Sequence, residues 1–344
     1  RVEPGTAGVP GSTVIRFRNV SHRAAAGMNL YLPRGYRRWL RDHIRDFDVV
    51  LLQDVYSAVS VGGARAAHEA GVPYVLQPLG TLSPAAERGR PLAKQAFLRA
   101  WGFRTVQEAT ALIHSTDFER QDFLEAGAQE DQLLRLPLPL ELPEPTPRAK
   151  ADRPTVISVG RLHAIKRLDV LVEAIAIARR SIPEIRLDIV GPGDQVHSEL
   201  ERQVAELGLG NTVTLHGFVS VDKKFALLSR AHVGALLSAS EGLPMAALEY
   251  MACGLPVVLS QGCHLPEVNG VAGTVVDGSP EAAARAVVTL SQDKLLWGRL
   301  SLGAERFAAE FQPETVMPRM IHAMAQLAHA YPGPSAHRRT GSRA

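Results

Sequence analysis

The sequence predicts an α/β protein made of doubly wound parallel sheets. Short apolar runs of β-forming residues alternate with longer helical patterns over most of the 344 residues, which is the rhythm of repeated β-α-β units. One proline-rich stretch interrupts this alternation, and the length is sufficient for two domains with a core each. We therefore expect two domains joined by a linker.

Four apolar runs predict the strands of the first domain, which is placed at residues 1–150. They are VIRF (14–17), DVVLL (48–52), YVLQ (74–77) and LIHS (112–115). Helical stretches separate them, as in a parallel sheet that is buried on both faces. The prolines that follow cannot lie in a helix interior or a central strand, so they predict the interdomain linker. They are Pro137, Pro139, Pro143, Pro145, Pro147 and Pro154.

The second domain is expected at residues 151–312. Its predicted strands are 156–160, 187–191, 213–216, 233–238 and 256–259, and its predicted helices are 168–180, 196–207, 222–230, 244–252, 280–291 and 293–310. A last helix, 313–331, is expected to pack back on the first domain. The polar, basic segment 332–344 is expected to be a disordered tail.

Composition excludes several classes of protein. With 46% hydrophobic and 21% charged residues the chain has an ordinary globular balance, and a net charge of +3 is too small to argue for nucleic acid as a partner. Two cysteines, Cys253 and Cys263, are too few for a disulfide framework and lack metal-ligand spacing, so a cytoplasmic setting is the default expectation. No apolar run approaches the roughly 20 residues that span a bilayer.

Two acids lie in the otherwise small and apolar segment SASEGLPMAALEYMACGLPVVLS (238–260). Glu241 is expected in the loop before a helix that Pro244 opens, and Glu249 one to two turns inside that helix. Carboxylates can accept hydrogen bonds from sugar or ribose hydroxyls, and free amides of the first helical turn favour an anion. Alternatively, Glu241 merely interacts with the helix dipole and Glu249 is exposed to solvent.

The segment GRLHAIK (160–166) places two cations after a predicted strand, at the edge of the sheet where ligands of α/β proteins bind. Arg161 and Lys166 could hold a diphosphate there, the first as a fork and the second as a point charge. A solvated basic loop is the alternative. The tripeptide Asp46-Phe47-Asp48 precedes a strand rather than following one, so we interpret it as a helix end and not as a metal site.

Four motifs in this order resemble the donor half of glycosyltransferase family 4, also called group 1. They are GRxxxxK (160–166), GxGD (191–194), HGFV (216–219) and ExxxxxxxE (241–249) followed by MACGLPVV. The resemblance implies the GT-B fold, in which two Rossmann-like domains face a central cleft. It implies a retaining, metal-independent, cofactor-free transferase of the hexosyltransferase type. Such an enzyme moves a sugar from a UDP- or GDP-sugar to a saccharide or lipid-linked acceptor, for example in polysaccharide biosynthesis.

The resemblance also assigns roles to residues. Arg161 and Lys166 would bind the donor diphosphate and Glu241 the hydroxyls of the donor sugar, so these three form the expected catalytic set. Glu249 would bind the ribose, the amides of Met245 and Ala246 the phosphate, and the backbone around Gly217 the base. The expected donor-binding set is Gly160, Gly217, Phe218, Val219, Gly242, Leu243, Met245, Ala246 and Glu249.

The chain departs from the family pattern mainly in its first domain. We expect the first strand and its glycine-rich loop to be missing, because Gly5, Gly8 and Gly11 follow no apolar strand. The segment PLGTL has Leu79 where the family often has His, and Arg167 replaces a common Gly after the phosphate lysine. A truncated or non-catalytic nucleotide-sugar binding protein is therefore the alternative function.

Other nucleotide-binding classes fit poorly, and a membrane contact stays open. A dehydrogenase fits badly because IVGPGD has Val196 where the third glycine of GxGxxG belongs. Two basic stretches with aromatic residues, 34–47 and 88–104, could lie on an anionic membrane, which would make the protein peripheral at the inner face. Ordinary surface helices with a core-facing apolar side are the favoured interpretation of both stretches.

Overall fold

Six parallel strands form the sheet of the second half of the chain, in the order β12-β11-β10-β7-β8-β9. Their bounds are β7 (Thr155–Val159), β8 (Arg186–Val190), β9 (Val213–Leu215), β10 (Val233–Leu236), β11 (Val257–Ser260) and β12 (Gly273–Val276). The structure is a computed structural model that describes residues 3–5, 13–21, 31–82, 91–142 and 150–331. By internal contacts the chain divides into unit 1 (1–136 and 318–344) and unit 2 (137–317).

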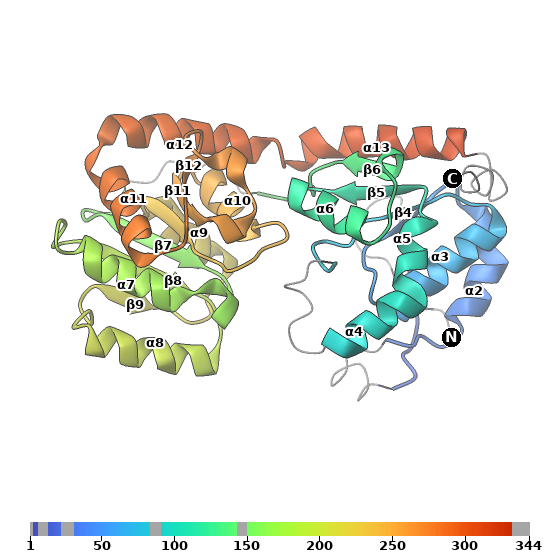
Figure 1. Ribbon diagram of the computed structural model, residues 1–344, viewed down its shortest axis with the longest axis horizontal. Coiled ribbons are helices and arrows are strands. Elements are labelled where there is room, and N and C mark those ends of the chain that lie inside the picture. The colour runs from blue at the N-terminus through green and yellow to red at the C-terminus, as the bar shows by residue number, and fades with distance from the viewer. Residues whose placement is uncertain (1–2, 6–12, 22–30, 83–90, 143–149, 332–344) are drawn as a thin grey trace. The chain divides into compact units, whose positions relative to one another are not determined.

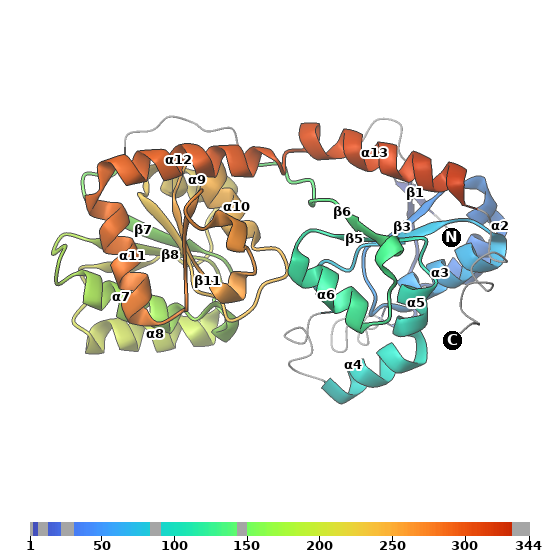
Figure 2. The same cartoon turned by 45° about the horizontal axis from the view of Figure 1, so that its top comes forward.

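Helices cover both faces of the unit 2 sheet, as Figures 1 and 2 show. One hydrophobic core joins the sheet to α7 (Leu168–Ala178), α8 (Asp194–Glu206) and α11 (Pro280–Gln292). A second core joins it to α9 (Val221–Arg230), α10 (Met245–Ala252) and α12 (Lys294–Ala309). Neighbouring residues of one strand face different cores, since Val156 belongs to the first and Ile157 to the second. The doubly wound sheet is therefore confirmed for unit 2.

Capping side chains fix where several of these helices begin. The hydroxyls of Ser220 and Ser279 accept hydrogen bonds from the amides of Lys223 and Ala282, at the starts of α9 and α11. Asp293 does the same for α12 through the amide of Leu296. These caps fix the residue at which each helix begins, and therefore also the end of the loop that precedes it.

Unit 1 contains a parallel sheet of four strands in the order β3-β4-β5-β6. The strands are β3 (Val50–Leu52), β4 (Tyr74–Leu76), β5 (Ala111–His114) and β6 (Leu133–Arg135). One core holds one face of this sheet against α2 (Tyr36–His43), α3 (Ala58–Ala70), α5 (Phe103–Gln107) and α6 (Asp117–Glu125). On the other face the apolar side of α13 (Pro313–Ala330) packs over Val75, Ala111 and Ile113.

Three strand predictions need correction. The segment predicted as a first-domain strand at 14–17 is β2 (Val14–Arg16), but it pairs antiparallel with β1 (Glu3–Gly5) in a separate two-stranded sheet. Two strands were not predicted: β6, which lies directly before the prolines, and β12, which begins with a glycine. Both are short segments beside residues that favour turns, so their β character is weak in the sequence.

The two basic stretches of unit 1 are helical. The first forms α2 and a 3-10 helix, η1 (Ile44–Asp46), and the described part of the second forms α4 (Pro91–Phe97), the π-helix η3 (Leu98–Gly102) and α5. Leu40, Ile44 and Leu98 are buried in the unit 1 core. The apolar sides of both stretches thus pack inward. Asp46 ends η1 and β3 begins at Val50, which is where the sequence placed the Asp46-Phe47-Asp48 tripeptide.

Several predictions concern residues outside the described part of the chain. These are Gly8 and Gly11, the prolines Pro143, Pro145 and Pro147, residues 88–90 of the second basic stretch, and the tail 332–344.

Candidate functional site

The strand order of unit 2 reverses beside β7. From β7 the chain adds β8 and β9 on one side, and then places β10, β11 and β12 on the other. In open α/β sheets, ligands bind outside the carboxyl ends of the strands at such a reversal. The loops that leave β7 and β10 there are residues 160–167 and 237–244, which carry all three residues of the expected catalytic set.

Lys166 and Glu241 meet across this reversal point. The Nζ atom of Lys166 lies 2.7 Å from Oε1 of Glu241, and the two side chains are only 21% and 15% exposed. Backbone hydrogen bonds hold the two loops, because the amide of Ala239 donates to the carbonyl of Ile165 (2.7 Å) and that of Glu241 to Gly262 (2.8 Å). The structure therefore brings the predicted phosphate lysine and the predicted sugar carboxylate into one ion pair.

Glycines let the loops after β7 and β8 come close together. A Cβ atom at Gly191 would lie 1.8 Å from the carbonyl oxygen of Gly160, and one at Gly193 would lie 2.5 Å from that of Leu162. The two glycines have φ values of 148° and 150°, which side chains rarely allow. Gly160 itself lies beside the lysine, since a Cβ there would be 3.9 Å from Nζ of Lys166.

Arg161 differs from Lys166 in being exposed. It makes no ion pair with any other residue that the structure describes. Its guanidinium group is thus available to an anionic ligand at the mouth of the β7 loop.

A second ion pair lies in the second turn of α10. Oε1 of Glu249 is 2.7 Å from Nζ of Lys224 on α9, with exposures of 22% and 20%. The same ammonium lies 4.5 Å from the ring centre of Phe225. Sequence reasoning missed Lys224, because it belongs to no motif and the fold alone brings α9 beside α10. The alternative that Glu249 is simply solvent-exposed does not hold, since its carboxylate is largely covered and paired.

The first turn of α10 offers fewer free amides than expected. The helix begins at Met245, but the amide of Met245 already donates to the carbonyl of Leu243 at 2.9 Å. The amide of Ala246 has no partner within the described residues. One predicted anion-binding amide of the pair is therefore occupied in this structure. Gly242 and Leu243 lie in the loop before the helix, as predicted, and both are half-buried.

The segment after β9 is held by a mostly covered polar pair. Nε2 of His216 lies 2.9 Å from Oδ1 of Asp188 on β8, with both side chains mostly covered. The carbonyl of Gly217 accepts a hydrogen bond from Gly191 (2.9 Å), and Phe218 next to it is 81% exposed. Val219 packs partly against the core of α9 and α10. Asp188 is a charged residue inside the apolar run LDIV, and this pattern could have predicted a polar partner for it.

Other groups do not join this site. Burial raises the pKa of the Cys253 and Cys263 thiols to about 11, so both stay protonated at neutral pH and act as packing groups. Among the described residues no cluster of three or more His, Cys, Asp or Glu has the arrangement of a metal site. Leu79 lies in unit 1, is 44% exposed, and has a left-handed φ of 54°.

Profiles of two protein families match the chain, one for each half. The family described as glycosyl transferases group 1 matches residues 153–293. The glycosyl transferase 4-like domain matches residues 2–139. Together they cover most of the two units described above.

Two curated relatives are about 30% identical to the chain over little more than half of their own length. A GDP-mannose-dependent alpha-(1-6)-phosphatidylinositol monomannoside mannosyltransferase of Mycolicibacterium smegmatis is 30% identical over 59% of this chain and 57% of its own length. A D-inositol 3-phosphate glycosyltransferase of Thermobispora bispora is 28% identical over 60% of this chain and 54% of its own. The chain thus spans little more than half the length of these relatives.

Solved structures share the fold. Anabaena HepE in complex with UDP superposes with a TM-score of 0.72 at 20% identity, covering 84% of this chain and 82% of that chain. Sucrose-phosphate synthase of Thermosynechococcus elongatus gives 0.74 at 20% identity, with 94% and 86% covered. At such low identity these matches establish the fold alone, which consists of two parallel-sheet α/β domains. In the part of the chain that the structure describes, none of the helices has the length and apolar character needed to cross a bilayer.

Proposed function

The chain belongs to the group 1 glycosyltransferase family, and we propose from this premise that it transfers a sugar from a UDP- or GDP-sugar to a saccharide or lipid-linked acceptor. The observation that carries the proposal is the pair of ion pairs at the reversal point of the unit 2 sheet. Lys166–Glu241 and Lys224–Glu249 place two cations and two hydroxyl acceptors beside the first turns of α10. This composition suits a molecule with a diphosphate between two polyhydroxy groups.

In this proposal the cations stabilise the leaving group. Cleavage of the bond between sugar and phosphate leaves a nucleoside diphosphate with new negative charge, which preorganised cations stabilise as it develops. Arg161 is exposed and unpaired among the described residues, so it reaches the diphosphate first, while Lys166 shares its charge between the phosphate and Glu241. Glu241 then accepts hydrogen bonds from the donor sugar. Two cations in this place are the basis for proposing a metal-independent reaction, and retention of configuration rests on the family resemblance.

The nucleoside end is assigned to the other ion pair. Glu249 would accept hydrogen bonds from the ribose hydroxyls, and Lys224 would hold that carboxylate in place. The backbone of Gly217 to Val219 would lie along the base, with the exposed ring of Phe218 able to stack on it. One of the two relatives named above is GDP-mannose-dependent, while HepE was solved with UDP, so both bases are candidates.

The acceptor side is proposed from the family and from unit 1. The names of the two relatives contain phosphatidylinositol monomannoside and D-inositol 3-phosphate, which favours a saccharide or lipid-linked acceptor here. A cytoplasmic enzyme with peripheral membrane contact, acting in the synthesis of envelope or other polysaccharides, would fit such an acceptor. The apolar sides of the basic stretches pack inward, so the exposed arginines of α2 support that contact, through attraction to anionic lipids.

Leu79 favours a second candidate function, binding of a nucleotide-sugar without transfer. Its side chain cannot donate or accept a hydrogen bond at a strand end where the family often has His, so the chain could bind the nucleotide-sugar without transferring it. Sugar-nucleotide binding without release of nucleoside diphosphate in the presence of acceptors would favour this binding protein.

Thermal shift with UDP, GDP, ADP and their common sugars, without added metal, tests the donor site. A ligand at 100 times its dissociation constant adds roughly 2.7 kcal/mol to the free energy of unfolding. We expect one nucleotide to stabilise the wild type, and Glu249→Gln to weaken its binding by about tenfold or more. Glu206→Gln, on the exposed side of α8, is the matched control and should bind like the wild type. If no nucleotide stabilises the folded wild type, the donor-site assignment is wrong.

A further inference from the structure

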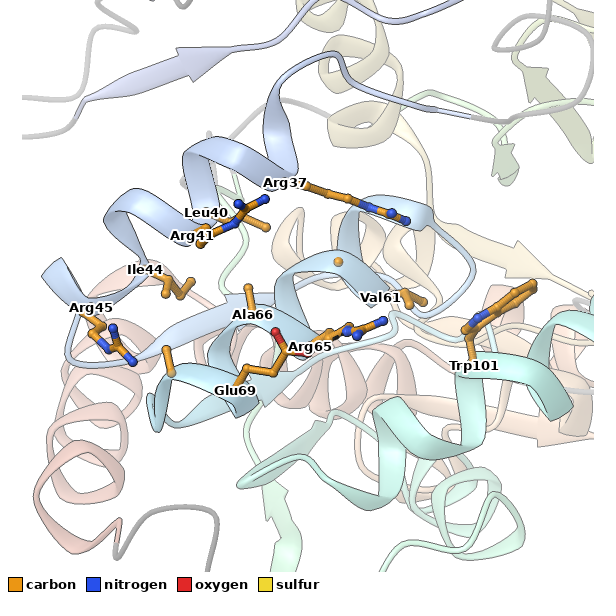
Figure 3. Close-up of a pocket in the computed structure, with 12 residues that line it drawn as sticks. Arg37, Leu40, Arg41, Ile44, Arg45, Val61, Arg65, Ala66, Glu69 and Trp101 are labelled. Carbon is orange, nitrogen blue, oxygen red and sulfur yellow. Dashed lines mark hydrogen bonds and ion pairs between the residues drawn. The ribbon is translucent and has the colours of Figure 1, made fainter.

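A cavity of about 520 Å³ lies between α2 and α3 in unit 1, outside the donor site. In Figure 3 three arginines lie along the α2 side, and Arg65 and Glu69 of α3 lie across from them. Trp101 marks one end of the cavity and Arg45 the other. The volume falls in the range of small-molecule sites.

The α2 side carries a row of like charges. Arg37 and Arg41 are four residues apart, so they lie on one face of α2 about 6 Å apart along its axis, and Arg45 follows in η1 and lines the same cavity. Like charges at this spacing destabilise a helix. All three side chains are exposed and form no ion pair with any residue in the described ranges, whereas their neighbour Arg38 is 3.8 Å from Asp42.

The α3 side does not compensate this charge. Glu69 is the one carboxylate among the residues that line the cavity, and its Oε1 atom is 2.7 Å from Nε of Arg65. The cavity therefore has four guanidinium groups and one carboxylate, and that carboxylate is paired with Arg65. The floor is apolar, with Leu40 and Ile44 buried beneath the arginines.

We propose that this cavity binds a phosphate-bearing ligand through Arg37, Arg41 and Arg45. Guanidinium forks match phosphate oxygens in pairs, and a phosphate monoester carries up to about two negative charges where a carboxylate carries one. A row of three unpaired guanidinium groups therefore favours phosphate. The apolar floor and the exposed ring of Trp101, at 53% exposure, provide contact for the group that carries the phosphate.

The phosphate could come from two sources with the same chemistry, a soluble phosphate ester or the headgroup of a membrane lipid. All residues that line the cavity belong to unit 1, so ligand binding there is independent of the donor site in unit 2. Where it concerns lipid, it deepens the proposed peripheral contact by assigning a defined site to the headgroup.

The test uses the full chain carrying Lys166→Ala, which weakens the diphosphate site in unit 2. Inorganic pyrophosphate is titrated calorimetrically, and flotation is measured with vesicles of phosphatidylcholine alone or mixed with phosphatidic acid. Arg41→Gln with Arg45→Gln removes two forks from the cavity. Arg41→Gln alone is also compared with the control Arg38→Gln, which removes the same single charge from the same helix outside the cavity. Equal melting temperatures without ligand establish that all variants fold.

We expect the double variant to raise the pyrophosphate dissociation constant by at least about tenfold, with less than about a twofold change for Arg38→Gln. That result assigns the site to soluble phosphates. If pyrophosphate does not bind, and only the double variant no longer floats with vesicles that contain phosphatidic acid, the site binds lipid headgroups. If the double variant and Arg38→Gln behave alike with both probes, the proposal is overturned, and the UDP and GDP test of the donor site is unaffected.

Discussion

Each glutamate of the predicted donor segment forms an ion pair with a lysine, but only one of these lysines could be identified from the sequence. Lys166 belongs to the motif GRxxxxK, which fixes its place after β7, and it meets Glu241. Lys224 belongs to no motif and reaches Glu249 because α9 and α10 lie side by side on one face of the sheet. Local spacing therefore predicts residues on the same loop, while partners from another helix depend on tertiary packing.

Arg167 shows why a position can favour glycine in a family without a role in chemistry. It is the N-cap of α7 and has a left-handed φ of 49°, a conformation that costs a non-glycine residue about 1–2 kcal/mol. Sequence comparison suggested only that a glycine had been replaced. The backbone conformation gives the physical reason, which is the sharp turn from the phosphate loop into the helix.

Asp122 makes the stability of unit 1 depend on pH. Burial, with the charges of Glu125 and Glu119 as smaller causes, raises its pKa from an ordinary value of 3.8 to about 7. Oδ2 is buried and finds no hydrogen-bond partner among the described residues. Between these two pH values the folded state holds a proton that the unfolded state has lost, so this group lowers stability as pH rises through that interval. The penalty is fully present above the folded pKa.

We therefore expect Asp122→Asn to raise the free energy of unfolding at pH 8 and to change it little at pH 4. Denaturant unfolding at several pH values measures the difference, and Asp131→Asn, an exposed acid of the same unit, serves as the control. A gain that is equal at both pH values would show that ionisation of Asp122 is not the cause.

At the scale of elements, strands with long apolar runs were predictable from the sequence. Two strands with short apolar runs were missed. The strands of unit 2 from β7 to β11 were predicted within a few residues because each is a continuous apolar run between helical patterns. β6 and β12 begin or end beside proline or glycine and were missed. The segment at 14–17 has strand propensity, but propensity does not determine which sheet a strand joins.

Gly191 couples the loops of three neighbouring strands. Its φ of 148° and the close carbonyl of Gly160 leave no room for a side chain, and its amide donates to Gly217. We expect Gly191→Ala to separate the β7 and β8 loops, with a loss of roughly 2–4 kcal/mol in stability and of nucleotide binding. Thermal unfolding and nucleotide titration measure the two effects.

Gly210→Ala is the matched control, since a Cβ there meets no atom within 4 Å. It should leave both quantities close to those of the wild type. Unchanged nucleotide binding in a folded Gly191→Ala protein would mean that the close approach of these loops does not shape the ligand site.

At the scale of the whole molecule, the C-terminal helix completes the core of the N-terminal unit. Met320, Ala323, Met324 and Leu327 follow the i, i+3, i+4, i+7 pattern, and they pack on Val75, Ala111 and Ile113 of the unit 1 sheet. The chain therefore closes unit 1 only after unit 2 has been traversed. The pattern predicted the helix, but which sheet it covers depends on contacts far apart in the sequence.

Met324→Asp should accordingly destabilise unit 1 by roughly 2–4 kcal/mol, because it places a charge against an apolar sheet face. Ile321→Asp lies on the same helix at 62% exposure and should change stability by less than about 0.5 kcal/mol. Hydrogen exchange resolves the two units separately, which matters because a protein with two units need not unfold in one step.

The expected result is faster exchange in β4 and β5, with β7 and β8 still protected and nucleotide binding in unit 2 retained. This follows if the contacts of residues 320–327 stabilise unit 1 alone, as the separate cores indicate. Equal loss of protection in β7 and β8 would instead show that the two units unfold as one cooperative block. In that case the helix would act as a structural link for the whole chain, and stability measured at any site would report on both units.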